Sequence, residues 1–139
     1  MNRRNDARGW IMAVAIPAAV FLFAAPARAQ LKDCSALGTT SALDQCYGER
    51  YKQADAMLND VYRRLLGKLD PSTQTLLRQA EEAWIAFRDK ECAFETAGTN
   101  GGSIHTMEVS ICLTAQTQAH TAALSKQLNC PEGDTSCTH

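Results

Sequence analysis

Six cysteines constrain this chain more than any other feature: Cys34, Cys46, Cys92, Cys112, Cys130 and Cys137. An even set of cysteines in a short exported chain is typical of a domain stapled by disulfides. A zinc site is the alternative, but the chain has no C-x-x-C pair and no histidine at a ligand spacing from a cysteine. We therefore expect disulfides, no bound metal and no cofactor.

The first 29 residues have the order of a secretory signal peptide. A start with three arginines is followed by an uncharged apolar run over residues 10–25 and by the small-x-small cleavage site Ala27-Arg28-Ala29. The run is short for a bilayer span, so a retained anchor is the alternative to cleavage. We expect a Sec-type signal over 1–29, no stable membrane anchor after cleavage, and a periplasmic or secreted bacterial protein that begins near Gln30.

Removal of the signal peptide makes the chain acidic. Of 14 Lys+Arg and 15 Asp+Glu in the whole sequence, residues 1–29 hold four Arg and one Asp, so residues 30–139 carry ten basic and 14 acidic side chains, a net charge of −4. Binding to phosphate backbones needs clustered Lys and Arg, so nucleic acid is not an expected partner. The same charge is compatible with a basic protein partner.

Residues 30–139 are the length of one domain, and their apolar residues recur at helical spacing. The pattern predicts helices over about 41–69, 71–94 and 103–128, with a short Cys-containing tail over about 129–139. Ser41, Asp70 and Ser103 are the expected N-caps. The tight junction at Asp70-Pro71 predicts an antiparallel hairpin, so the fold class is all-α: a helical hairpin plus a third helix. The expected buried side of the second helix is Leu76, Leu77, Ala80, Ala83, Trp84, Phe87 and Phe94.

Positions on the two arms of this hairpin can be matched by level, because both helices rise by about 1.5 Å per residue. Asp55 then lies within one turn of Arg88, and the two side chains are candidates for an ion pair across the helices. Asn59 and Tyr62 share the helical face of Asp55. A polar network that fixes the register of two helices is the favoured interpretation of these residues.

The sequence does not provide a complete set of catalytic residues of a known type. A glycosidase needs two facing carboxylates, and the only candidates beside Asp55 are Glu81 and Glu82, which we expect to face solvent beside Arg78. No G-x-S-x-G motif supports a serine nucleophile. Trp84 and Phe87 are interpreted as core residues. The stretch Gly101-Gly102-Ser103 is interpreted as a flexible loop ending in a cap rather than an anion site.

Several motifs together resemble one known family. They are Cys34 and Cys46 spaced by twelve, A-D-x-x-L-N-x-x-Y over residues 54–62, A-W-I-x-F-R-D-x-x-C over residues 83–92, the G-G-S of residues 101–103, and Cys112. This set is similar to the lysozyme-inhibitor LprI-like family of small exported bacterial domains, over residues 34 to about 128. The motif residues, which we interpret as structural, are Asp55, Asn59, Tyr62, Trp84, Phe87, Arg88 and Asp89.

The resemblance implies an all-helical, disulfide-bonded module that binds a protein, with lysozyme as the candidate partner. Two positions depart from the family pattern: Glu81 stands where the family usually has Gln, and His120 stands near a usual Arg. The resemblance also implies the pairing Cys34–Cys46 and Cys92–Cys112, with Cys130–Cys137 closing the tail. Level matching permits a second pairing, Cys46–Cys92 with Cys34–Cys112.

Three functions follow as hypotheses. The first is an exported protein-binding module without enzymatic activity that inhibits lysozyme-type muramidases. The second is an envelope structural or stress adaptor with another protein partner. The third is an enzyme acting on cell-wall material, in which Asp55 would be the residue to test.

Overall fold

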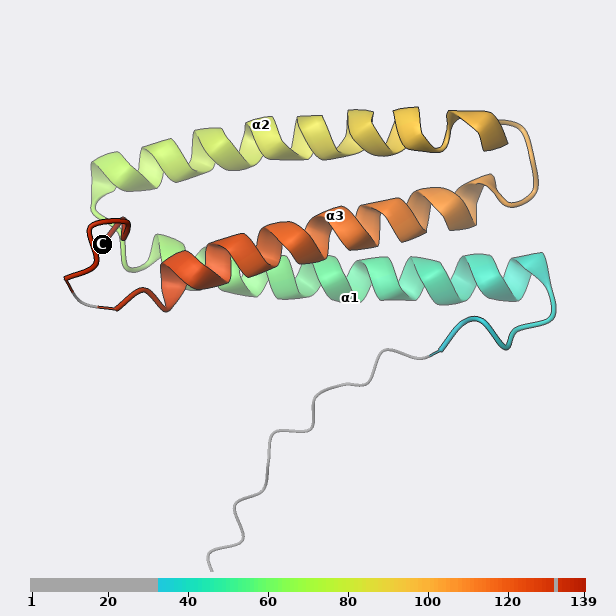
Figure 1. Cartoon of the computed structure of the whole chain (residues 1–139), viewed down its shortest axis with the longest axis horizontal. Coiled ribbons are helices and arrows are strands. Elements are labelled where there is room, and N and C mark those ends of the chain that lie inside the picture. Colours follow the sequence, from blue (N-terminus) through green and yellow to red (C-terminus); the bar gives the residue numbers. More distant parts are fainter. Residues whose placement is uncertain (1–32, 132) are drawn as a thin grey trace, which may run out of the picture.

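The computed structural model describes residues 33–131 and 133–139, and within them three long helices lie side by side with roughly parallel axes (Figure 1). They are α1 (Thr40–Leu66), α2 (Pro71–Glu95) and α3 (His105–Leu128), with the 3₁₀ turn η1 (Ala97–Thr99) between the last two. α2 runs opposite to α1 and α3 (Figure 1). The all-α fold class is thus confirmed over the described residues, and the predicted signal peptide lies outside them.

The two arms of the hairpin are held apart by the third helix. α3 packs more closely against α1 than against α2, although α1 and α2 are joined by the short turn at residues 67–70. Lys68 Nζ in this turn donates a hydrogen bond to the backbone oxygen of Leu128 at 2.8 Å. A lysine at a helix C-terminus satisfies an otherwise free carbonyl. The turn is therefore fastened to the end of α3.

Of the three N-cap residues predicted from the sequence, the structure confirms one. Asp70 caps α2 as predicted, because its carboxylate accepts hydrogen bonds from the backbone N–H of Ser72 and Thr73. The prediction of Ser41 for α1 was wrong, since Thr39 is the cap and its side chain accepts from the N–H of Ala42.

The predicted Ser103 cap of α3 was also wrong. The turn after η1 continues through Gly102 to residue 104, and α3 begins at His105 without a side-chain cap. Thr99 supplies a local contact instead, because its Oγ1 lies 2.9 Å from His105 Nδ1. Gly101 and Gly102 lie in a loop, as predicted. Gly101 adopts a positive φ of +76°, a conformation that favours glycine.

The apolar core lies where the end of α1, the start of α2 and the end of α3 meet. Its buried members are leucines, with four half-buried neighbours: Leu58, Leu65, Leu69, Leu124 and Leu128, then Val61, Tyr62, Leu77 and Trp84. The other end of α3 buries small polar residues. Thr114 is buried there, and its hydroxyl bonds to the carbonyl of Ser110 one turn back, which satisfies it within its own helix.

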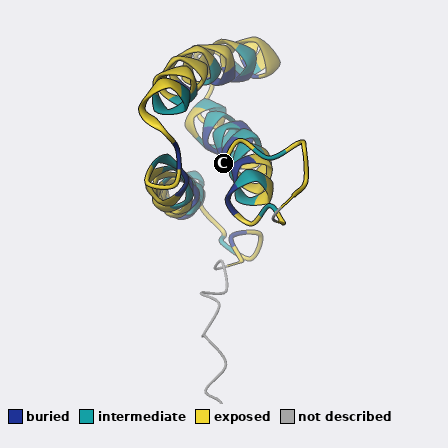
Figure 2. Cartoon of the chain, turned by 90° about the vertical axis from the view of Figure 1, so that its left-hand side faces the viewer, coloured by how far each residue is buried: buried dark blue, intermediate teal, exposed yellow. Residues whose placement is uncertain are grey.

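The expected buried side of α2 is largely wrong. Leu77 and Trp84 do pack on the core. The remaining members of that prediction are exposed: Leu76, Ala80, Ala83, Phe87 and Phe94. The buried residues of α2 are instead Glu81, Arg88 and Cys92. Figure 2 shows the outer side of α2 in the colour of exposed residues.

The six cysteines form the sequential pairing. The bonds are Cys34–Cys46, Cys92–Cys112 and Cys130–Cys137, which excludes the second pairing permitted by level matching. The middle bond joins α2 to α3 and closes a loop of 20 residues, which is expected to contribute about 3 kcal/mol by restricting the unfolded chain. Among the described helices, none is both long enough and apolar enough to cross a bilayer.

The Asp70 cap predicts a pH-dependent stability. Hydrogen bonds from Ser72 and Thr73 lower the pKa of Asp70 well below its ordinary value. The stabilisation is therefore complete above the unfolded pKa of about 3.9 and is lost as the pH falls toward the folded value. Asp70→Asn keeps a capping oxygen but cannot ionise. We expect the native chain to melt above the variant at about pH 6, and the gap to narrow toward about pH 2. Melting followed by circular dichroism measures this, and a gap independent of pH would contradict it.

Candidate functional site

A polar cleft of about 330 Å³ lies between α1 and α2. Its lining comes from both helices: Asp55, Leu58, Asn59 and Tyr62 from α1, and Arg78, Glu81, Glu82, Ile85 and Arg88 from α2. Level matching along the hairpin placed Asp55 within one turn of Arg88, with Asn59 and Tyr62 on the same face as Asp55. The structure brings these residues to the walls of one cleft.

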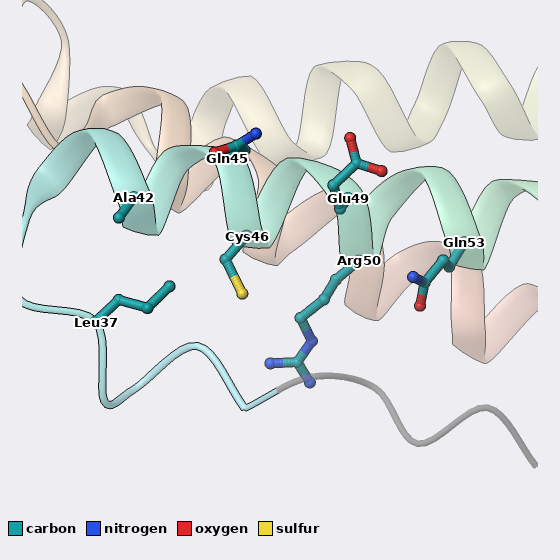
Figure 3. A pocket seen from close by; sticks show the side chains of 7 residues that line it. All are labelled: Leu37, Ala42, Gln45, Cys46, Glu49, Arg50 and Gln53. Atoms are coloured by element: carbon teal, nitrogen blue, oxygen red, sulfur yellow. The ribbon is translucent and has the colours of Figure 1, made fainter.

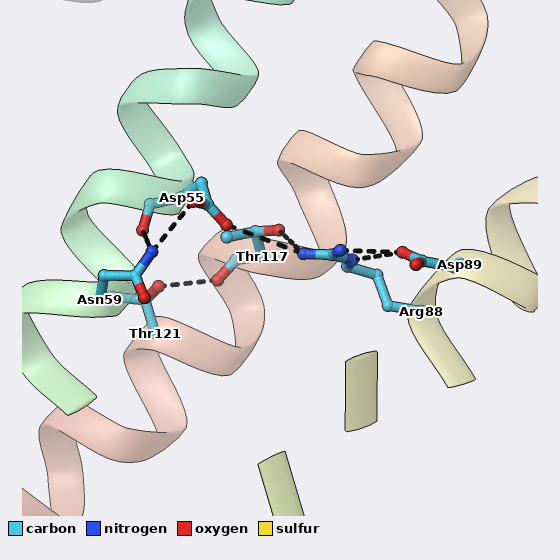
Figure 4. A network of polar contacts seen from close by, with 6 residues as sticks. All are labelled: Asp55, Asn59, Arg88, Asp89, Thr117 and Thr121. Atoms are coloured by element: carbon cyan, nitrogen blue, oxygen red, sulfur yellow. Dashed lines mark hydrogen bonds and ion pairs between the residues drawn. The ribbon is translucent and has the colours of Figure 1, made fainter. Parts of the chain in front are cut away.

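Arg88 lies at the floor of this cleft and is buried. Its Nε and Nη2 donate to Asp89 Oδ1 at 2.9 and 2.8 Å, and its Nη1 faces Thr117 Oγ1 of α3 at 3.5 Å (Figure 4). The same Nη1 lies 4.0 Å from Asp55 Oδ1 of α1. The guanidinium thus reaches a residue on each of the three helices, and the predicted ion pair between Asp55 and Arg88 is confirmed.

The two carboxylates around Arg88 are not equivalent. Asp89 makes the shorter contacts, whereas the Asp55 side chain is 44% exposed and sits at the outer limit of an ion pair. Asn59 Nδ2 donates to Asp55 Oδ2 at 2.9 Å and so fixes its orientation. A half-exposed pair in contact with water is worth little to stability. The Asp55 carboxylate is therefore held in place but open to the cleft.

Aromatic rings surround the guanidinium. The carbon centre of the Arg88 guanidinium lies 5.1 Å from the centre of the Trp84 ring and 5.6 Å from that of Tyr51. A cation over an aromatic face gains electrostatic stabilisation, more so when it is desolvated. Burial raises the pKa of the Tyr51 hydroxyl, and the nearby Arg88 charge opposes this shift. Trp84 was predicted as a core residue and is one, but Tyr51 had no signal in the sequence beyond its helical spacing.

A second buried polar pair was missed. Glu81 was expected to face solvent and is instead buried, with its Oε1 at 2.6 Å from His120 Nε2 of α3. An ionised carboxylate can only accept a hydrogen bond, so His120 Nε2 is the donor when Glu81 is ionised. The His120 ring also stacks on Trp84, with ring centres 4.0 Å apart. The two positions at which the sequence departs from the family pattern therefore contact each other.

Phe87 is the motif residue that does not join this cluster. It was interpreted as core, but it is exposed and points away from the cleft lining. Successive residues of a helix are about 100° apart, so the burial of Arg88 turns its neighbour outward. Glu82, in contrast, lines the cleft and is exposed, as expected.

Two further hollows flank α1. One, of about 470 Å³, lies on the other side of Arg88 and is lined in part by Tyr51, Asp89 and His105. The other, of about 390 Å³, lies between the start of α1 and the loop before it (Figure 3). Arg50 extends along this second hollow, with its guanidinium 5.6 Å from the Tyr47 ring. Its buried Nε has no hydrogen-bond partner among the described residues.

Several polar groups of the cleft wall already have partners within the fold. Glu81 is engaged by His120, and Asp55 is oriented by Asn59. A cluster of possible metal ligands in the described residues, Cys130 with Asp134 and Cys137, has its two sulfurs joined in a disulfide. Of the charged groups in the cleft wall, Glu82 and Arg78 are exposed and Asp55 is half-buried, so the wall presents two carboxylates and one guanidinium to solvent.

The comparisons with known proteins place this architecture in a family. A family model described as "Lysozyme inhibitor LprI" matches residues 32–124, which span α1, α2 and most of α3. An uncharacterized protein of Rhizobium meliloti (strain 1021) is 32% identical over 138 residues, covering 87% of this chain and 99% of that protein. No solved structure matches the chain.

The contact between Glu81 and His120 predicts energetic coupling. Glu81→Gln and His120→Ala are each expected to destabilise the fold, and the double variant should lose less than the two singles combined, with a coupling of about 0.5–3 kcal/mol. Urea unfolding of the four proteins measures it. The matched control is the exposed pair Asp60 and Arg64, 3.6 Å apart on α1, whose coupling should stay within about 0.5 kcal/mol. Equal coupling in the two cycles would contradict the prediction.

Proposed function

Because the chain belongs to the LprI lysozyme-inhibitor family, we propose that it is an exported binding protein that inhibits lysozyme-type muramidases by direct contact. The family match covers α1 and α2, which line the cleft, and most of α3. It therefore covers the cleft residues themselves, from Asp55 to Arg88. This match is the observation that carries the proposal.

The charge of the cleft fits such a partner. Asp55 and Glu82 contribute carboxylates to its wall, next to the exposed Arg78, and the neighbouring hollow contains Asp89 with a side chain that is 57% exposed. Residues 30–139 carry a net charge of −4. Opposite charge steers a basic enzyme such as lysozyme toward an acidic surface and raises the association rate. Lysozyme contact at the cleft opening is therefore the mode that we propose.

The support beneath the cleft is rigid. Arg88 ties α2 to α1 and α3, and the disulfide between Cys92 and Cys112 joins α2 to α3 a turn further on. A surface that is already ordered loses less conformational entropy on binding. The exposed carboxylates are thus presented on a frame that need not rearrange.

A lysozyme titration tests the proposal. We expect the activity of a c-type lysozyme to fall as the protein is added, with binding heat in calorimetry. The double variant Asp55→Asn/Glu82→Gln should bind about tenfold more weakly, because it removes two negative charges from the cleft wall. The control Glu49→Gln/Asp134→Asn makes the same change in net charge outside the cleft and should bind like the native protein.

Full lysozyme activity at excess protein, with no binding heat, would overturn this function. Weakening by the control variant as large as that by the cleft variant would overturn the proposed contact surface. Turnover of cell-wall material by the protein alone, lost in Asp55→Asn without a change in melting temperature, would replace inhibition with catalysis.

Export is part of the same proposal. The signal-like residues 1–29 and the pairing of all six cysteines support it, since disulfides persist in oxidising compartments. We expect the protein recovered from the periplasm or medium to begin near Gln30. N-terminal sequencing measures this, and an intact residue 1 in the recovered protein would contradict it.

A further inference from the structure

The outer side of α2 carries three large apolar side chains that are exposed. Leu76, Phe87 and Phe94 are 64%, 53% and 78% exposed, and Ala80 and Ala83, also exposed, lie among them. The buried side of the same helix is built from Glu81, Arg88 and Cys92. A helix that buries charge and exposes phenylalanine has an apolar face that the fold itself does not use.

The spacing of this outer face is that of a helix-packing seam. Leu76, Ala80, Ala83, Phe87 and Phe94 follow one another at steps of four, three, four and seven residues. This is the a/d pattern of a two-helix interface, with Lys90 at the one remaining position. At about 1.5 Å per residue the seam is about 27 Å long. We refer to these six residues as the α2 seam.

The α2 seam faces away from the polar cleft. Arg78 and Ile85, which line the cleft, lie about 160–180° around the helix from Leu76. At its other edge the seam opens into a hollow of about 240 Å³ whose lining includes Leu76, Ala80 and Leu124. A partner on the seam would therefore extend the apolar core and leave the cleft free.

We propose that the α2 seam pairs with the same seam of a second copy of the chain, antiparallel, about a two-fold axis at the level of residue 85. This register sets Phe87 against Ala83 of the second copy and Leu76 against Phe94. Large side chains then face small or flexible ones, as interdigitated packing requires. Lys90 meets Ala80, where its aliphatic stem covers the alanine and its ammonium reaches solvent.

The second copy is favoured over other occupants because the seam is complementary to itself. A two-fold interface needs one patch whose two halves match, and the sequence of the seam meets that condition. The exposed areas of Leu76, Phe87 and Phe94, with the smaller residues between them, amount to about 1,000 Å² over both copies, the lower limit of a specific interface. The pairing is accordingly expected to be reversible, with a dissociation constant in the micromolar range.

This inference goes beyond the proposed function and does not depend on it. Sedimentation equilibrium of the chain without its signal peptide, over a wide micromolar concentration series, should show a mass that rises from monomer toward dimer. Phe87→Glu should weaken the dimer at least tenfold, because it places a charge opposite Ala83 in an apolar contact. Its far-ultraviolet circular dichroism should stay native, since Phe87 is exposed.

The matched control is Met57→Glu on α1, a residue 61% exposed and outside the seam, which should dimerise like the native chain. A native chain that stays monomeric at several hundred micromolar, or a dimer that Phe87→Glu leaves intact, would overturn the proposal. Lysozyme titration separates the two hypotheses. If Phe87→Glu abolishes inhibition and the native chain is monomeric, the seam contacts lysozyme and self-pairing is wrong.

Discussion

The buried guanidinium of Arg88 is the group on which the arrangement of the three helices depends. Removal of a charge from water costs several kcal/mol unless the charge is paired. Here the cost is offset by Asp89 and the Trp84 ring, which lie on α2, and by Thr117, which lies on α3. Since Arg88 must face α3, the rotation of α2 about its own axis is set. That rotation places Glu81 against His120, Cys92 against Cys112, and Phe87 in solvent.

Features that depend on local signals could be predicted from the sequence. The second helix was expected over 71–94 and is observed over Pro71–Glu95, because a proline and a capping aspartate define its start without reference to the rest of the fold. The approach of Asp55 to Arg88 followed from the common rise of two helices joined by a short turn. The cysteine pairing implied by the family resemblance also agrees with the structure.

The side of α2 that faces the core could not be predicted, because this helix has two candidate sides. Periodicity favoured the side with Phe87, since hydrophobic residues are usually buried. The observed choice depends on polar groups that find partners on another helix, and a sequence does not show whether Glu81 will meet His120. Glu81 and His120 lie 39 residues apart in the chain, so their contact depends on how α2 and α3 pack and not on a local signal.

The close pairing of α1 with α3 has a consequence for the order of folding. These helices are the first and the last of the fold, and they run parallel with the whole of α2 between them in sequence. Contacts between distant segments pay a loop-closure cost before they contribute stability. When the chain emerges with its N-terminal side first, α1 and α2 are complete while the leucines of the core still lack Leu124 and Leu128. The domain therefore cannot close until the end of α3 has emerged, and the hairpin of α1 and α2 stays accessible to chaperones and disulfide catalysts until then.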